Sequence, residues 1–253
     1  SSLLQGATNV VVHGFRVVPA CASFTLNTVA LSNTVTAQST DLTNFAIYYD
    51  VNDNGTYESG TDLLASSNTP TVGTSMSFTL NTNNSGSIYR NYIVVANVAA
   101  GAVTGRTFKV NTTTLTLASG SATGTAAGNT HTISVNLCAT TPTALSCGTL
   151  VTTTLSGTGS ASTGNCGFST PGQEKMFSYV PEAGTGDYKL TVTSYSGSSS
   201  QYVDFFYKDA SSGCGTTGWQ CAGSVNGVST PTTWTLSLTA GHTYYIMADV
   251  EQT

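Results

Sequence analysis

The acidic side chains of this sequence are concentrated in one short stretch. YYDVNDNGTYESGTD, residues 48–62, holds four of the five Asp and Glu residues found among the first 173 positions. Counted from Asp50, side-chain oxygens fall at positions one, three and five, and a glycine, a main-chain carbonyl position and a carboxylate follow. This order is typical of a calcium loop, because alternate side chains point to the ion, the glycine permits a sharp turn and calcium takes several oxygen ligands.

We therefore predict a calcium site, and disfavour magnesium because its small octahedral shell suits all-protein cages poorly. The expected ligands are Asp50, Asn52, Asn54, Thr56 through its main-chain carbonyl, Glu58 and Asp62. The last acid stands one residue beyond its EF-hand position, and strands rather than helices are predicted on both sides, so the loop would be a variant. The alternative is a solvated hairpin turn, which also favours Asp, Asn and Gly but does not explain why acids that repel are gathered.

The six cysteines predict disulfides in an oxidising compartment, because their spacing is too wide for a zinc site. The favoured pairings are Cys214–Cys221, Cys147–Cys166 and Cys21–Cys138. The first of them would close the short, glycine-rich loop CGTTGWQC. Six cysteines allow fifteen connectivities, so the pairing stays open at this point.

The search for a catalytic group leads to the expectation that the chain is not an enzyme. No nucleophile elbow, zinc-protease motif or phosphate-binding loop occurs. His13 and His131 lie in apolar segments and are expected on sheet faces. Three carboxylates could form an acid–base pair of the glycosidase kind, but nothing in their spacing brings them together: Asp204, Asp209 and Asp249.

Two aromatic residues, Trp219 and Tyr202, are candidates for stacking on a sugar ring. The favoured interpretation is structural: Phe205 and Tyr207 face the core, and the two candidates cover its rim, as amphipathic aromatic side chains do.

Strand patterns dominate the rest of the chain, which has 8% charged residues and no stretch with apolar residues at helical spacing. Alternating apolar residues predict strand faces at Met76, Phe78 and Leu80; at Tyr188, Leu190 and Val192; and at Tyr244, Ile246, Ala248 and Val250. Short strands separated by Gly, Asn and Ser turns predict an all-β chain of sandwich type.

The length of 253 residues favours two domains. The segment CATTPTALSCG shows no sustained alternation, so we place a linker near residues 138–146. The prediction is two tandem β-sandwiches, immunoglobulin-like or jelly-roll-like, at residues 1–138 and 139–253. A first strand of the second domain is expected in TLVTTTLSGT, residues 149–158, and this domain is expected to be truncated at its last strand.

Charge and hydropathy disfavour two classes of partner. The net charge is −5 and the seven basic residues are scattered, so no basic stripe is present for nucleic acid. The longest apolar runs are too short to span a bilayer, so membrane insertion is not expected.

Residues 8–137 resemble a β-sandwich module repeated in large secreted and cell-surface adhesin-like proteins of gliding bacteria. The likeness is carried by NVVVHGFRV, DLTNFAIYYDVNDNGTYESGTDLLASS and SGSATGTAAGNTHTISV. Residues 145–253 are similar to the pre-peptidase C-terminal domain family through EKMFSYVPEAGTGDYKLTVTSY and LSLTAGHTYYIMADV. The first resemblance implies non-catalytic modules of a long extracellular protein exported by the type IX route, and it includes the acidic loop. The second family normally continues with one more strand.

Taken together, these patterns predict a structural segment of a calcium-stiffened, cell-surface adhesin or filament. Its expected partners are neighbouring modules of the same polypeptide or filament. The alternative is an ancillary carbohydrate-binding module of a secreted hydrolase, which would contact a surface glycan.

Overall fold

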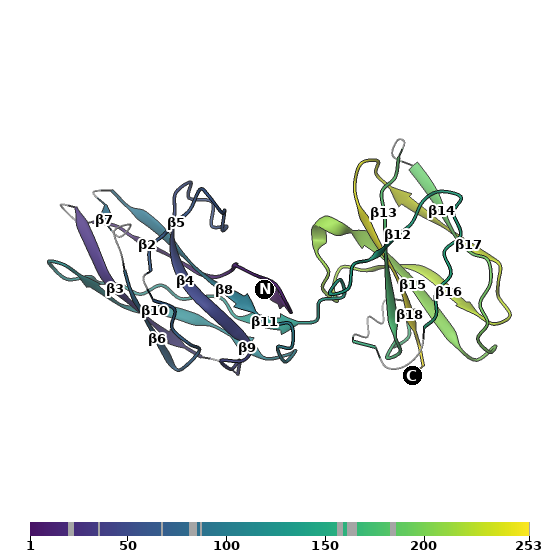
Figure 1. Ribbon diagram of the computed structural model, residues 1–253, viewed down its shortest axis with the longest axis horizontal. Coiled ribbons are helices and arrows are strands. Elements are labelled where there is room, and N and C mark those ends of the chain that lie inside the picture. The colour runs from purple at the N-terminus through teal and green to yellow at the C-terminus, as the bar shows by residue number, and fades with distance from the viewer. Residues whose placement is uncertain are drawn as a thin grey trace. The chain divides into compact units, whose positions relative to one another are not determined.

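The computed structural model describes residues 1–19, 23–34, 36–66, 68–80, 85–86, 88–155, 159–160, 166–182 and 186–252. The chain is all-β and divides into two compact units, Ser1–Ser134 and Val135–Thr253 (Figure 1). The division falls before the predicted linker at residues 138–146. In the described part of the chain no helix is long and apolar enough to cross a membrane.

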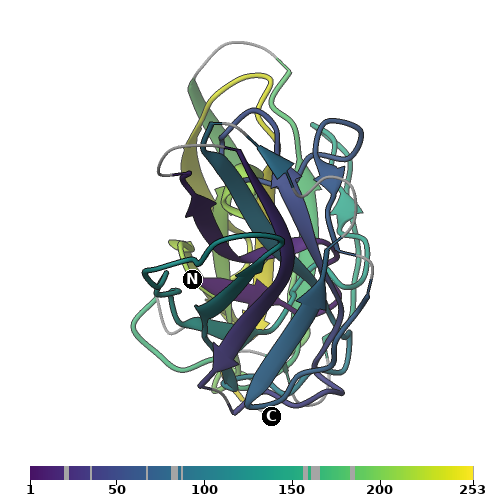
Figure 2. The same cartoon turned by 90° about the vertical axis from the view of Figure 1, so that its left-hand side faces the viewer.

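The described residues of unit 1 form three sheets. Figure 1 labels their strands, and Figure 2 shows the same cartoon turned by 90°. The first has the strand order β2 (Val10–Val17), β8 (Arg90–Val98), β4 (Leu42–Asp50) and β5 (Leu63–Leu64). The second has the order β10 (Val110–Leu117), β3 (Phe24–Asn33) and β6 (Ser75–Thr79), with β7 (Ser85–Gly86) also paired to β3. The third has the order β1 (Ser2–Leu4), β11 (His131–Ser134) and β9 (Thr107–Phe108). The one parallel pairing in these three sheets joins β1 to β11.

One apolar core joins the sheets of unit 1. It takes Phe45 and Ile47 from β4, and Leu26 from β3, all fully buried. The predicted alternation in β6 is confirmed, since Met76 and Phe78 are buried in the same core. Successive side chains along a strand point to opposite faces of the sheet, so every second residue is buried when one face is covered.

Asp41 is a buried polar connection within unit 1. Its carboxylate accepts hydrogen bonds from Gln38 N (2.7 Å), Val103 N (2.9 Å) and the Arg106 guanidinium (2.7 Å). Burial opposes ionisation, but these three donors outweigh it and hold the pKa of Asp41 below its usual value. The carboxylate thus ties the turn before β4 to the loop between β8 and β9.

Unit 2 contains a five-stranded sheet and a two-stranded ribbon. The sheet order is β12 (Thr143–Ala144), β13 (Glu174–Tyr179), β18 (Tyr244–Val250), β15 (Tyr202–Asp209) and β16 (Gln220–Asn226). The ribbon pairs β14 (Gly186–Val192) with β17 (Thr232–Leu238). A short 3₁₀ turn, η2 (Ala210–Ser212), follows β15.

The inner core of unit 2 lies between the sheet and the ribbon. The alternating residues predicted in β14 and β18 pack in it, which confirms both strand faces. The ring of Trp234 in β17 lies 5.3 Å from that of Phe205 in β15. Gly223 stands opposite Phe205 with φ of 151°, and a Cβ there would lie 2.1 Å from Trp234 Nε1. Only glycine therefore permits this packing.

A second apolar cluster lies on the opposite, outer face of the five-stranded sheet. It consists of Leu137, Met176, Phe206, Trp219 and Met247, all buried. Leu137 precedes the predicted linker directly, and β12 within that linker pairs with β13. The predicted linker is therefore packed on unit 2.

One strand prediction for unit 2 is wrong, and one strand of this unit was not predicted. The Thr-rich segment at residues 149–158 forms no strand over its described part, residues 149–155. In contrast, β16 has the sequence QCAGSVN and was not predicted, because it lacks a regular apolar alternation. Its pairing with β15 holds it in the sheet.

The buried carboxylate of Asp41 gives a test of the separate stability of unit 1. Both tryptophans, Trp219 and Trp234, belong to unit 2, so tryptophan fluorescence follows unit 2 and calorimetry follows both units. We expect Asp41→Asn to destabilise unit 1 by about 3 kcal/mol, because Arg106 loses its buried charge partner. The transition seen by tryptophan fluorescence should not move.

The matched control for this prediction is Asp53→Asn. Asp53 pairs with Arg16 at 3.2 Å, but both side chains are exposed. Exposed pairs contribute at most about 1 kcal/mol. Equal losses of stability in the two variants would show that Asp41 is not a structural centre of unit 1.

Candidate functional site

The acidic loop, residues 51–62, is the connection between β4 and β5. Tyr49 pairs with Leu63 across the neck of this hairpin. Asp50 and Asp62 stand at either side of the neck, where they are 2% and 7% exposed. Asp53 and Gly55 have left-handed backbone, with φ of 58° and 73°, which produces the sharp turn expected from the glycine.

The two buried carboxylates close the loop through its own N–H groups. Asp50 accepts hydrogen bonds from Asn54 N (3.3 Å) and Gly55 N (2.8 Å). Asp62 accepts them from Val51 N (3.3 Å) and Glu58 N (2.7 Å). Each carboxylate thus accepts hydrogen bonds from main-chain N–H groups of the loop. In a strand, the ladder to a neighbouring strand would satisfy such groups.

The other predicted ligands are exposed or partly exposed and bond to one another. Asn52 donates its amide hydrogen to Glu58, while Asn54 Oδ1 accepts from the N–H and hydroxyl of Thr56. Within the described residues, no three His, Cys, Asp or Glu side chains form a group that could hold a metal ion. Hydrogen bonds connect the predicted ligands with their neighbours in the loop, but Asp50, Glu58 and Asp62 do not form such a group, and calcium binding there stays a prediction.

The three predicted cysteine pairings are wrong. The disulfides are Cys138–Cys214 and Cys166–Cys221, while Cys147 is free and exposed. Cys21 lies outside the described residues. Sequence proximity misled the prediction, because Cys221 belongs to an extended strand, β16, and Cys214 precedes that strand. Both bond to cysteines that precede β13 in the chain, Cys138 and Cys166, which pack against the outer apolar cluster.

The two aromatic candidates for glycan stacking have different environments. Trp219 is 4% exposed, and its ring packs in the outer apolar cluster beneath the Lys208 ammonium, 4.5 Å from the ring centroid. Lys208 also donates to the carbonyls of Gly215 and Thr217, and burial lowers its pKa to about 8. A sugar cannot stack on the Trp219 ring in this arrangement. Tyr202 is 37% exposed.

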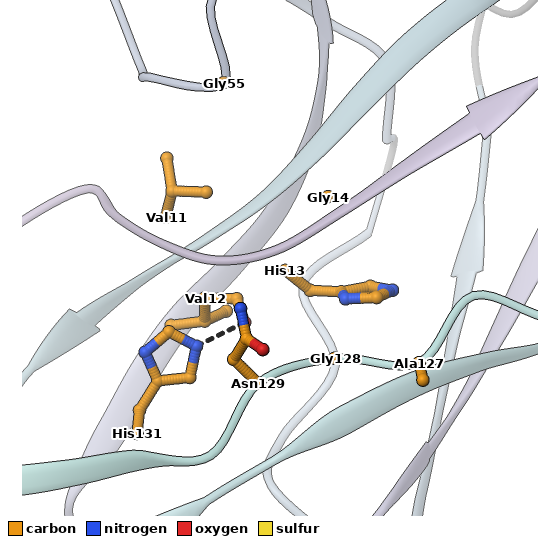
Figure 3. A pocket seen from close by; sticks show the side chains of 9 residues that line it. All are labelled: Val11, Val12, His13, Gly14, Gly55, Ala127, Gly128, Asn129 and His131. Carbon is orange, nitrogen blue, oxygen red and sulfur yellow. Dashed lines mark hydrogen bonds between the residues drawn. The ribbon is translucent and has the colours of Figure 1, made fainter. Parts of the chain in front are cut away.

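The two histidines of unit 1 border a pocket of about 270 Å³ (Figure 3). His131 Nε2 lies 2.9 Å from the Val12 carbonyl, drawn as the dashed line in Figure 3, and Nδ1 lies 2.6 Å from Ser1 Oγ. Because a carbonyl only accepts, Nε2 carries the proton and Nδ1 accepts from the serine. His13 Nε2 bonds to Thr112 Oγ1 at 2.9 Å.

Both imidazoles are held in the neutral form. Burial, with a smaller contribution from His131, lowers the pKa of His13 to about 4. Burial also lowers the pKa of His131. The positions in β2 and β11 and the complete hydrogen bonding of His131 give these side chains a structural role.

The structure brings together two of the three carboxylates that sequence spacing could not connect. Asp204 in β15 lies directly opposite Asp249 in β18, and Asp249 lies opposite Glu174 in β13. We call Glu174, Asp249 and Asp204 the acidic row. Asp209 lies elsewhere. It directly precedes η2, and its Oδ2 atom is 2.7 Å from Nδ1 of the His242 imidazole.

The acidic row is on the outer face of the sheet, where Glu174 is partly exposed and the two aspartates are buried. Asp204 and Asp249 are both 0% exposed. Burial, and then Glu251, raise the pKa of Asp204 to about 7. Burial also raises the pKa of Asp249 to about 7, assisted by Glu174 and Asp204 and opposed by the Thr170 hydroxyl. The sequence signal for this row was an aspartate among apolar residues in each of two strands, at DFF and MADV.

Comparison with known proteins does not place the chain in a family. No protein-family model matches it, and no curated protein matches it. Among solved structures, the crystal structure of the CupB6 tip adhesin from Pseudomonas aeruginosa aligns over 96% of this chain and 81% of that chain, at 8% identity and a TM-score of 0.16. That score is too low for the two folds to correspond, so no conclusion rests on it.

The acidic loop predicts a calcium response of unit 1. Calcium that binds the native state raises its stability, by ~2.7 kcal/mol at a hundred times the dissociation constant. We expect the calorimetric transition of unit 1 to rise from excess EGTA to millimolar calcium, and Asp50→Ala to abolish the rise. Asp53→Asn should keep it. An unchanged transition in the parent would identify the loop as a hydrogen-bonded turn without a metal.

The buried His13 predicts that unit 1 loses stability in mild acid. Its pKa is about 4 in the folded state and about 6.5 when unfolded, so only the unfolded chain takes up this proton as pH falls from 6.5 to 4. We expect a loss of about 2 kcal/mol between pH 7 and pH 5, measured by urea unfolding. His13→Gln should remove most of it, whereas His242→Gln, at an exposed position, should not.

Proposed function

We propose that the chain is a non-catalytic structural segment of an extracellular, cell-surface protein of the adhesin or filament type. The observation that carries the proposal is the Cys138–Cys214 disulfide, which spans 76 positions of sequence. It joins the first residues of unit 2 to the connection between β15 and β16. The chain enters unit 2 within a few residues of this cross-link.

A cross-link at this place shields most of unit 2 from a pulling force. Tension applied at residue 135 and at the C-terminal end passes from Cys138 through the sulfur–sulfur bond to Cys214. The chain between these two residues cannot be extended while the bond is intact. Only the part from Cys214 onward carries the load, and it ends in β18, which pairs with β13 and β15. Such resistance suits a segment that connects other modules under load.

The cysteine chemistry supports an extracellular location for the same role. Disulfides form and persist in oxidising compartments such as the cell surface and the periplasm. In unit 2 they fasten an irregular segment that has few ladder hydrogen bonds of its own. Exposed edge strands such as β16 offer unpaired backbone to neighbouring modules, which are the partners that we propose. Calcium in the acidic loop of unit 1 would restrain its carboxylates and stiffen that hairpin.

The structural role predicts specific extensions in single-molecule force spectroscopy of the full chain held at both ends. With both disulfides intact, unfolding of unit 2 should release about 15 nm of contour length, because only residues from Cys214 onward extend freely. Under reducing conditions the whole unit should extend, by about 40 nm.

Two paired variants identify which bond bears the load. Replacing Cys138 and Cys214 by serine leaves Cys166–Cys221 as the remaining shortcut, so about 22 nm should be released without reductant. Replacing Cys166 and Cys221 by serine should leave the release at about 15 nm. If the oxidised parent released about 40 nm, the disulfides would not shield unit 2 and the proposal would lose its support.

A further inference from the structure

Asp204 and Asp249 are buried in unit 2 without enough hydrogen-bond donors. No donor among the described residues reaches either carboxylate oxygen of Asp204, nor Oδ1 of Asp249. The Thr170 hydroxyl donates to Asp249 Oδ2 at 2.7 Å. Three carboxylate oxygens are therefore left without a hydrogen on one face of the sheet, where opposed side chains have Cβ atoms about 4.5–5.5 Å apart.

No side-chain cation compensates these carboxylates. The ion pairs among the described residues are Arg16–Asp53, Arg106–Asp41 and His242–Asp209, which all lie elsewhere. Lys208, on the same face of β15, is engaged with the carbonyls of Gly215 and Thr217. Glu174 and Glu251 add further negative charge beside the two aspartates. An unpaired buried carboxylate costs several kcal/mol, which either a bound proton or a positive partner removes.

We propose that a calcium ion binds between Asp204 and Asp249 on the outer face of the five-stranded sheet. The donor atoms there are all oxygens, which suit calcium, whereas zinc prefers nitrogen and sulfur. The unpartnered oxygens of the two aspartates supply three ligands. Main-chain carbonyls and water supply the others, because Glu174 and Glu251 lie beside the aspartates but the described residues contain no group of three acids that could hold a metal. A site with two carboxylates should bind weakly, in the range of about 10⁻⁴–10⁻³ M found for extracellular modules.

The segment above the acidic row gives the ion a structural consequence. Ser160 N donates to both oxygens of Glu174 (3.0 and 2.9 Å), and Gly172 N donates to the Val250 carbonyl at 2.9 Å. Gly159 lies so close that a Cβ would be 1.9 Å from the Gly172 carbonyl. Cys166, in the same segment, is bonded to Cys221 of β16. Calcium would therefore hold this segment on the sheet next to the disulfide.

Tryptophan-monitored thermal unfolding of the full chain tests the site, because both tryptophans are in unit 2. We expect 10 mM calcium at pH 7.5 to raise the tryptophan-detected melting temperature by several degrees relative to EGTA. Magnesium at the same concentration controls for ionic strength and should give little change. The acidic loop of unit 1 contains no tryptophan, so calcium binding there does not produce this signal.

The variants Asp204→Asn and Asp249→Asn should each abolish the calcium shift. In EGTA each should melt at or above the parent temperature, since a buried charge has been removed without loss of volume. Asp209→Asn, in the same unit, and Asp50→Ala, in the loop of unit 1, should retain the shift. The proposal is overturned if the parent shows no calcium shift, or if the shift survives in both Asp204→Asn and Asp249→Asn. A melting temperature that rises only on acidification would show that the aspartates share a proton instead.

This site does not rest on the proposed structural role. The force measurements depend on the two disulfides and can be made in EGTA. If calcium does not shift the melting temperature of the parent but the oxidised chain still releases only about 15 nm, only the cation site is contradicted. If calcium shifts the melting temperature but the oxidised chain releases about 40 nm, only the structural role is contradicted.

Discussion

Unit 2 depends on burying both faces of its five-stranded sheet. The inner face packs against the β14–β17 ribbon, as in an ordinary sandwich. The outer face carries an apolar cluster around Phe206, which costs free energy if it is left in water, and beside it the acidic row, which costs free energy when it is buried. Part of the cover is chain without strand structure around Leu137, Cys138 and Cys166. Its attachment by Cys138–Cys214 and Cys166–Cys221 is therefore what makes a closed outer face possible.

The buried carboxylates of the two units follow different rules. In unit 1, Asp41, Asp50 and Asp62 all accept hydrogen bonds from main-chain N–H groups of loops. These bonds offset the cost of burying each charge, and they satisfy donors that would otherwise have no partner. In unit 2, Asp204 and Asp249 face each other from strands whose N–H groups are already used in the sheet. The same residue type thus organises backbone in one unit and places two carboxyl groups with too few hydrogen-bond donors side by side in the other.

The two disulfides and the two buried carboxyl groups concern the same part of unit 2. The segment between Cys138, close to the start of the unit, and β13, which begins at Glu174 of the acidic row, contributes Cys138 and Cys166 to the cover of the outer face. Covalent bonds hold this segment at Cys138 and Cys166, and the proposed ion lies beside Thr170. A load-bearing segment would gain from this arrangement, because an irregular cover is the part of a sandwich that opens most easily.

The amino-acid sequence by itself determined the local features of this protein. Period-two alternation placed β6, β14 and β18 and their buried faces, and the Asp, Asn and Gly residues of positions 50–62 placed a sharp acidic turn between two strands. It did not predict β16, whose place in the sheet comes from pairing with β15 rather than from its own pattern. Only the tertiary structure decided the cysteine partners and the meeting of Asp204 with Asp249. These depend on strand order and register, which bring together residues tens of positions apart and leave no periodic trace in the sequence.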